Sequence, residues 1–460
     1  MGEVGSSGKG SSTFHRDWTK GSIVYNLLSL SWPIMINYSV FAVIQAADMI
    51  WVGKLGATPV AGVGIAGIVY MLVLSVIMGL SMGARALIAR FWGAGDYDSA
   101  NHVSGQALLI SAVFGVIMMV IGIFLSESIL SLFGLETDVV AEGAIYLRTV
   151  AIVWVPLSIW IMAQSIMGAS GDTVTPMKIA ISIGSINVLL CPFLVLGWWL
   201  FPRMGVSGAA MSNIVAYTLG MILSLWFHFT GRTRLRLTLV SFRLDLNTIG
   251  RILKIGIPAT VSSIQGSFVS LVLAWFMAAY GTLAVAAHSL TQRAQQLLFM
   301  PGIAVGMGAG VLVGQNLGAG QPERAERSGW QAVGLVEGFM VACSVAILVW
   351  AESIVQIFST EPDLVEITGI FMRIAVGGYL AHGFAGVLQN SISGAGDTVP
   401  PMLVSLITMW LLQLPLAYFL PRLTDLGVYG VRWAMVTGTI VGAVAYTTYF
   451  RLGRWKRKRV

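Results

Sequence analysis

The sequence predicts an all-α polytopic membrane protein, with twelve transmembrane helices in two parallel six-helix lobes related by a pseudo-two-fold axis along the membrane normal. Only 10% of the 460 residues are charged and 56% are hydrophobic. A soluble domain carries about 25% charged residues, so this chain has too little charge to cover a water-facing surface. Apolar runs of about twenty residues or more recur, whereas a transmembrane β-barrel would show short alternating segments. The two halves of the chain also repeat.

The chain opens with a Gly/Ser-rich polar tail over residues 1–22, which lacks the basic-then-apolar pattern of a signal peptide. About twelve apolar runs long enough to cross a bilayer follow it. These spans are expected to begin near Ile23, Pro59, Val103, Val139, Thr173, Gly205, Leu246, Leu283, Ser328, Leu364, Val399 and Gly427. The pattern predicts an N-terminal lobe over 23–230, a cytoplasmic linker over 231–246, a C-terminal lobe over 247–450 and a basic cytoplasmic tail over 451–460.

The positive charges predict the orientation. If the N-terminus is cytoplasmic, most of the 27 Lys and Arg residues fall on the inner side, including those of the linker and of the C-terminal tail. The positive-inside rule therefore places both termini in the cytoplasm of a protein of the cell inner membrane. The net charge of +7 is then a topology signal, and no nucleic-acid partner is expected.

An internal duplication predicts the lobe architecture. A shift of 225 residues aligns Gly, Pro and charged residues through most of the two halves. Matching pairs include Pro33 and Pro258, Gly83 and Gly308, Gly93 and Gly318, Glu127 and Glu352, Arg148 and Arg373, and Asp172 and Asp397. Compositional bias would pair Leu with Leu at many shifts, but it would not align these residue types at one shift. Six spans per half is an even number, so both lobes have the same orientation in the membrane.

Two duplicated helical lobes are typical of a carrier whose substrate site lies between them. A channel would need a selectivity filter or rings of charge, and the sequence has neither. A receptor would need a soluble sensory or effector domain, and an ATP-driven pump would need a Walker-type loop. The sequence therefore favours a transporter, and it predicts neither catalytic residues nor a metal-ligand cluster.

Several paired segments resemble the multidrug and toxic compound extrusion (MATE) family. They are WGAGDYDSA (92–100) and GQNLGAGQPERA (314–325), GASGDTVTPM (168–177) and GAGDTVPPM (394–402), and MGVSGAAMSN (204–213) and LGVYGVRWAM (426–435). The resemblance implies a cleft between the lobes that opens alternately to each side and extrudes small organic compounds, drugs included, in exchange for H⁺ or, less favoured, Na⁺. It implies no cofactor besides that ion, and a monomer in the lipid bilayer is expected.

The nearest alternative is a lipid-linked-sugar flippase of the same superfamily, which would also use a lateral opening and a cationic cleft. Twelve spans and the turn motifs quoted above argue against it.

Asp48 is the first candidate for a functional residue. The 225-residue shift places Leu273 opposite it, whereas a scaffold acid would be expected in both lobes. An acid inside a span is costly and usually functional. The alternative is an interfacial acid close to Lys54.

In one branch of the resembled family, a first-helix Asp is the proton-linked residue, and Asp48 matches it. The resemblance further implies a helix hinge at Pro33 and a coupling network that includes Tyr146, Asn187 and position 191. That branch has Asp at the last position, where this chain has Cys191. A hard cation prefers several oxygen ligands, so the missing carboxylate disfavours Na⁺ there. A single carboxylate can still exchange a proton.

A second branch of the family uses a Glu in the seventh helix and an Asp in the tenth. The matching positions here hold Gly266, beside Gln265, and His382. Sodium coupling of that type is therefore not expected. His382 could titrate near neutral pH, although a hydrogen-bonded interior histidine is the favoured interpretation.

Arg293 and Glu337 are expected at the same depth of the C-terminal lobe, when both are counted from the outer ends of their helices at 1.5 Å per residue. The favoured interpretation is an intralobe salt bridge, because unpaired charges in a bilayer are costly. The alternative is that Arg293 faces the cleft, which would favour an anionic or zwitterionic substrate.

Overall fold

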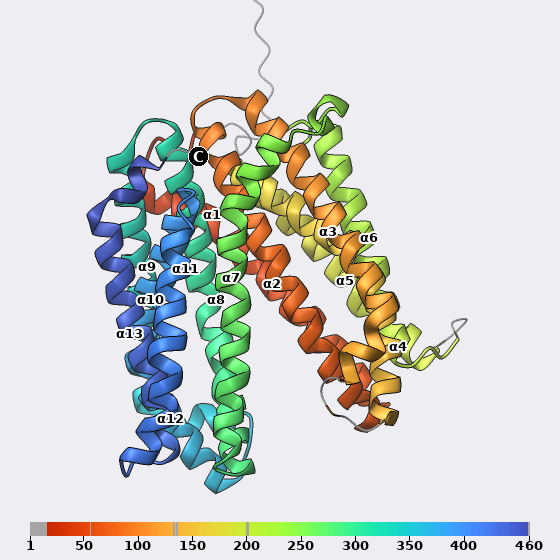
Figure 1. Ribbon diagram of the computed structural model, residues 1–460, viewed down its shortest axis with the longest axis vertical. Coiled ribbons are helices and arrows are strands. Elements are labelled where there is room, and N and C mark those ends of the chain that lie inside the picture. The colour runs from red at the N-terminus through yellow and green to blue at the C-terminus, as the bar shows by residue number, and fades with distance from the viewer. Residues whose placement is uncertain (1–15, 56, 132–133, 135–136, 199–201, 459–460) are drawn as a thin grey trace, which may run out of the picture.

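The computed structural model describes residues 16–55, 57–131, 134, 137–198 and 202–458, and within these ranges the chain is helical and contains no strand (Figure 1). The first half comprises α1 (Ile23–Gly53), α2 (Ala57–Gly93), α3 (Tyr97–Ser131), α4 (Thr137–Ala169), α5 (Val174–Leu196) and α6 (Val206–Phe229), followed by the short helix η1 (Leu239–Phe242). The second half comprises α7 (Leu246–Ala278), α8 (Thr282–Gly318), α9 (Pro322–Gln356), α10 (Pro362–Gly394), α11 (Val399–Leu406), η2 (Ile407–Gln413), α12 (Leu414–Leu423), α13 (Val428–Leu452) and η3 (Arg454–Arg457).

Twelve helical segments in the described part of the chain are long and apolar enough to span a membrane, which confirms the predicted fold class. The eleventh segment is built from α11, the π-helical turns of η2, and α12. Two helices start earlier than expected, α3 at Tyr97 and α9 at Pro322, because their polar first turns extend beyond the apolar run. Residues 1–15 of the predicted N-terminal tail and residues 459–460 lie outside the described residues.

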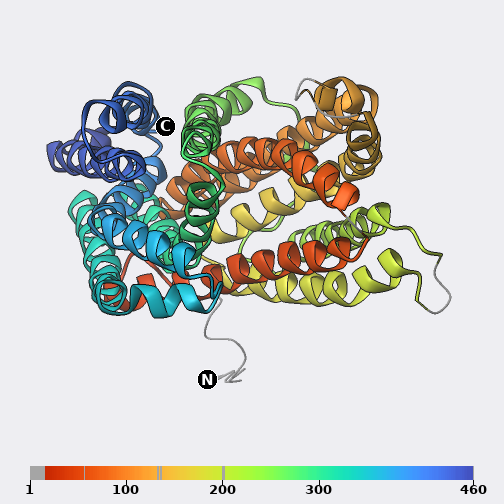
Figure 2. The same ribbon diagram turned by 90° about the horizontal axis from the view of Figure 1, so that it is seen from below.

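The two halves form two bundles that are visible in both views (Figures 1 and 2). Each bundle has the same ion pair between its third and fourth helices. Arg148 Nη2 lies 2.8 Å from Glu127 Oε1, and Arg373 Nη1 lies 2.5 Å from Glu352 Oε1. These four residues are related by the 225-residue shift, so the duplication read from the sequence is also a duplication of contacts.

The lobes meet along a seam of glycines, and this seam explains the paired GAG motifs. A Cβ added to Gly93 would lie 2.0 Å from the Gln315 carbonyl oxygen, and one added to Gly318 would lie 2.0 Å from the Arg90 carbonyl oxygen. Gln315 follows Arg90 by 225 residues, as Gly318 follows Gly93. The ends of α2 and α8 therefore cross at the pseudo-two-fold axis, where only glycine permits so close a backbone approach.

A second pair of contacts obeys the same symmetry. A Cβ on Gly83 would lie 2.4 Å from the Ile252 carbonyl oxygen of α7, and one on Gly308 would lie 2.8 Å from Ser31 Oγ of α1. These contacts lie toward the end of the molecule that carries both chain termini, which we call the terminal end. Toward the opposite end the ribbons of the two lobes diverge (Figure 1).

The tails fold across the terminal end. Arg90 Nη2 of α2 donates to the carbonyl oxygens of Ala395 at 3.2 Å and Lys458 at 2.8 Å, so the C-terminal tail connects the lobes. Lys458 Nζ also lies 3.1 Å from Asp397 Oδ1. Near the N-terminus, Trp18 is buried. Both tails therefore support the closed seam.

The linker packs against the N-terminal lobe. Gln106 Nε2 of α3 donates to the carbonyl oxygens of Ser241 at 3.0 Å and Arg243 at 2.8 Å. Asp245 caps α7 by accepting from Asn247 N at 2.9 Å and Thr248 Oγ1 at 2.6 Å. The Thr248 hydroxyl contributes most to holding the pKa of Asp245 at about 2, so this N-cap stays charged down to strongly acidic pH.

Candidate functional site

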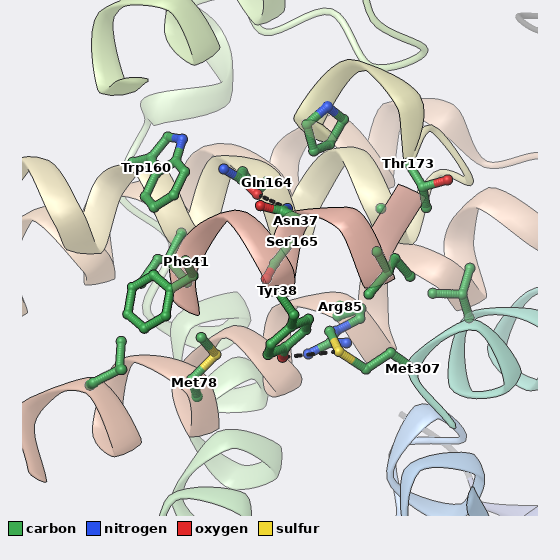
Figure 3. A pocket seen from close by; sticks show the side chains of 16 residues that line it. Asn37, Tyr38, Phe41, Met78, Arg85, Trp160, Gln164, Ser165, Thr173 and Met307 are labelled. Atoms are coloured by element: carbon green, nitrogen blue, oxygen red, sulfur yellow. Dashed lines mark hydrogen bonds between the residues drawn. The ribbon is translucent and has the colours of Figure 1, made fainter. Parts of the chain in front are cut away.

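A cavity of about 190 Å³ lies at the base of the divergence between the lobes, among α1, α2, α4, α5 and α8 (Figure 3). Aromatic side chains, methionines and a few polar groups line it. They include Asn37, Tyr38, Phe41, Met78, Arg85, Trp160, Gln164, Ser165, Thr173 and Met307. No acidic residue is among the described lining residues, so Arg85 is the one charged group on its wall. Such mixed apolar walls with few polar groups are typical of small-molecule sites.

The polar groups of this cavity are partly ordered by one another. Asn37 Nδ2 donates to Gln164 Oε1 at 2.5 Å, which joins α1 to α4. Tyr38 Oη donates to Met307 Sδ at 3.2 Å, which joins α1 to α8 of the other lobe (Figure 3). The first helix therefore contacts both lobes at the cavity.

A second cavity of about 350 Å³ lies inside the C-terminal lobe, between α8, α9 and α10. Its wall is apolar except for Cys343 and Tyr379. It offers no charged group to orient a ligand, and it is remote from the seam between the lobes. The interlobe cavity is therefore the better candidate for a substrate site.

Asp48 lies in the interior of the N-terminal lobe, about seven residues along α1 from the cavity wall at Phe41. Its side chain is 8% exposed. Asn213 Nδ2 of α6 donates to Asp48 Oδ2 at 2.7 Å, while Asp48 Oδ1 is buried without a hydrogen-bond partner. A buried carboxylate with one unpartnered oxygen is a natural acceptor for a proton.

Two predicted members of the network surround Asp48 from α5. Asn187 Nδ2 donates to Asn213 Oδ1 at 3.1 Å and to Ser212 Oγ at 3.3 Å. The Cys191 thiol is hydrogen-bonded to the Asp48 carboxylate. The groups that face this carboxylate are therefore hydrogen-bond donors, which stabilise an anion but do not ligate a cation.

Three tyrosines link this cluster toward the cavity. Tyr146, predicted from the sequence, is close enough to Asp48 to interact with it electrostatically, as are Tyr70 and Tyr217. The Tyr70 and Tyr217 hydroxyls are hydrogen-bonded to each other. The Tyr217 ring lies 5.3 Å from the ring of Trp160, which lines the cavity. Packed side chains thus connect Asp48 with the cavity.

The alternative of an interfacial acid near Lys54 does not fit the position of Asp48. Asp48 is buried, and the Lys54 ammonium lies over the Trp51 ring, 4.1 Å from its centroid. Pro33 is buried inside an α1 that continues from Ile23 to Gly53. Its predicted role as a hinge concerns movement, and it stays a prediction.

The C-terminal candidates do not form one cluster. Gln265 Nε2 is hydrogen-bonded to Ser405 Oγ, which joins α7 to α11. The His382 ring stacks on Phe299 at 3.9 Å and 13°, and no hydrogen bond of its ring is found within the described ranges. The expectation of a hydrogen-bonded histidine is therefore wrong, because an aromatic neighbour occupies the face of the ring.

The favoured salt bridge between Arg293 and Glu337 is also not formed. Arg293 of α8 is exposed, and the ion pairs of the described residues do not include it. The Glu337 carboxylate instead approaches α10, where a Cβ on Gly383 would lie 2.1 Å from Oε1. Equal depth on two helices does not make two side chains point toward each other.

Sequence reasoning missed Asn213 and Arg85. Both break the internal repeat, the signal that identified Asp48, because the paired motifs place Met435 opposite Asn213 and the 225-residue shift places Gly310 opposite Arg85. A search for polar residues present in one lobe alone would have found both. The described residues contain no group of three or more His, Cys, Asp or Glu side chains that could hold a metal ion.

Removing the Asn213 amide should destabilise the fold measurably. In Asn213→Leu the buried Asp48 carboxylate loses its 2.7 Å donor, and we expect a loss of about 1–3 kcal/mol in unfolding free energy, seen as a lower melting temperature in detergent. The double variant Asp48→Leu/Asn213→Leu removes both partners and should recover most of that loss. Equal destabilisation in the single and the double variant would contradict this coupling.

These features define a class: a polytopic helical membrane protein of two homologous lobes, with a cavity between them and a buried polar cluster in one. The MatE family model matches residues 33–193 and 258–419, one match in each lobe. The chain therefore belongs to the MATE family.

Curated relatives agree with this assignment. The chain is similar to the probable multidrug resistance protein NorM of Thermotoga maritima, with 26% identity over 94% of this chain and 93% of that protein. It is also similar to the probable multidrug resistance protein YoeA of Bacillus subtilis, with 25% identity over 93% of each. The crystal structure of a MATE protein in the bent conformation has the same fold, with a TM-score of 0.89, 22% identity and coverage of 95% of this chain and 96% of that one.

Proposed function

We propose that this protein is a secondary active antiporter that exports small organic or drug-like compounds in exchange for protons, by alternating access between the two lobes. The buried carboxylate of Asp48 carries the proposal, because its Oδ1 is unpartnered and the other lobe has no counterpart. The names of the relatives, probable multidrug resistance proteins, support the substrate class.

The mechanism follows from the two sites that α1 joins. We place both termini in the cytoplasm of the inner-membrane protein, so that a seam closed at the terminal end corresponds to an outward-facing state. In this state a proton from outside binds Asp48 and removes its charge. The Asn213 and Cys191 donors then lose their anionic acceptor, α1 bends at Pro33, and its cavity residues Asn37 and Tyr38 release the substrate.

Sodium is the less favoured coupling ion. A hard cation such as Na⁺ is best held by several oxygen ligands. The nearest groups to Asp48 are the Asn213 amide nitrogen and the Cys191 thiol, both of which donate. The cluster is therefore suited to a carboxylate that gains and loses a proton. We further propose that the protein acts as a monomer.

Everted membrane vesicles test the coupling ion. Respiration acidifies the vesicle lumen, and a proton antiporter should partly collapse this gradient when ethidium or 2-naphthoate is added, in Na⁺-free buffer. Export that needs Na⁺ and leaves the pH gradient unchanged would replace protons with sodium. Movement of a lipid-linked sugar with no proton release by either compound would favour the flippase instead.

A further inference from the structure

We propose that the interlobe cavity selects amphipathic aromatic anions, with the Arg85 guanidinium binding the carboxylate of the exported compound. This inference rests on the proposed export function and names its substrate class. It comes from the one charged side chain on the described wall of the cavity.

Arg85 is buried and lacks a counterion. Its side chain is 9% exposed, and Nε has no hydrogen-bond partner. No ion pair of the described residues involves it. A charge inside a bilayer is costly and is normally paired or wetted. The cavity that Arg85 lines is the place from which a partner can come.

A structural role is the simplest alternative, and the repeat argues against it. The scaffold arginines Arg148 and Arg373 occur in both lobes and have carboxylate partners. Arg85 has Gly310 at the equivalent position and no such partner. It therefore resembles Asp48, a charged residue confined to one lobe, rather than the duplicated scaffold.

The surroundings of Arg85 fit an aromatic carboxylate. A guanidinium binds a carboxylate through two parallel hydrogen bonds, a geometry that no other side chain offers. Phe41, Tyr38 and Trp160 supply ring surfaces on the same wall, and the Asn37–Gln164 pair supplies amide groups. The cavity volume of about 190 Å³ suits a small ring system.

Substrate charge also determines how the membrane potential drives export. If a proton enters as an anion leaves, both movements carry charge in the same direction, whereas exchange of a proton for a monovalent cation moves no net charge. Each net charge multiplies the attainable gradient by about 50-fold per 100 mV. Export of the anion should therefore depend steeply on potential.

Equilibrium binding to the protein in lipid nanodiscs tests the charge preference directly. The probes share one ring system and differ in charge: 2-naphthoate, 2-naphthylmethanol and 2-naphthylmethylammonium. We expect 2-naphthoate to bind about 10- to 150-fold more tightly than the ammonium compound, the range expected of a charge-assisted contact. Arg85→Gln should abolish this preference and strengthen binding of the ammonium compound, a gain that misfolding cannot produce. Arg85→Lys should keep part of the preference.

Arg148→Gln is the matched control, because Arg148 lies in the same lobe away from the cavity lining, and it should keep the wild-type preference. Equal or tighter binding of the ammonium compound by the wild type would overturn the inference, as would unchanged 2-naphthoate binding in Arg85→Gln. Tighter binding of geranyl phosphate than of 2-naphthoate would assign the site to a lipid phosphate and also overturn it. Binding requires no ion gradient, so these outcomes are independent of whether export is coupled to protons.

Discussion

Asp48→Asn is expected to abolish uphill export while downhill movement of the same compound continues. One proton exchanged for one substrate at a gradient of 1 pH unit sustains about a 10-fold substrate gradient, since one pH unit corresponds to about 1.4 kcal/mol. The amide cannot release a proton, so the attainable gradient should fall to about one. Proteoliposomes with the membrane potential clamped at zero by valinomycin and K⁺ would measure both quantities.

Cys191→Ser is the matched control for this change. A hydroxyl replaces the thiol that is hydrogen-bonded to Asp48, so a donor stays in place and the gradient should persist. Uphill export by Asp48→Asn would show that protons are coupled elsewhere, with Glu337 of α9 as the next acid to examine. Loss of export in Cys191→Ser with Asp48→Asn active would likewise contradict the mechanism.

The fold was largely predictable because it depends on composition and repetition. Long apolar runs require helices in a bilayer, and the aligned Pro33 and Pro258 or Glu127 and Glu352 require two copies of one bundle. The interlobe contacts were not predictable in the same way. That Gly93 and Gly318 meet at the pseudo-two-fold axis depends on how the lobes dock, which the sequence of either lobe does not specify.

The candidate site was predictable where a residue departs from the repeat. Asp48 stood out because Leu273 lies opposite it, and the structure places Asn187 and Cys191 beside it. Arg85 was counted among the inner-side charges that define topology, whereas α2 continues to Gly93, about 12 Å beyond it. Position along the chain underestimated its depth in the lobe interface.

The C-terminal candidates show a second limit of sequence reasoning. Arg293 and Glu337 were compared by depth alone, but each residue of a helix turns the side chain by about 100°. Arg293 is exposed on α8, while the Glu337 carboxylate approaches Gly383 of α10. The direction in which a side chain points depends on helix packing, and neither periodicity nor depth determines it in a helix that is apolar all round.

The glycine seam should control which side of the molecule is open. Gly318→Leu would bring a Cβ to 2.0 Å from the Arg90 carbonyl oxygen, and a backbone atom cannot move aside as a flexible side chain can. Overpacking typically costs about 1–3 kcal/mol. The clash exists only while α2 and α8 meet, so this cost falls on the state that is closed at the terminal end. The ratio of open to closed molecules at that end should rise about 5- to 150-fold.

Spin labels at Asp98 and Glu323, both exposed at the terminal end of different lobes, would measure this shift as a larger population of long distances. Gly93→Leu should act in the same direction, because its Cβ would meet the Gln315 carbonyl oxygen at the symmetry-related position. Gly338→Leu is the control, since no atom lies within 4 Å of a Cβ at that position in α9. An unchanged distance distribution in folded Gly318→Leu protein would mean that the seam yields locally, and that the lobes do not move apart as rigid bodies.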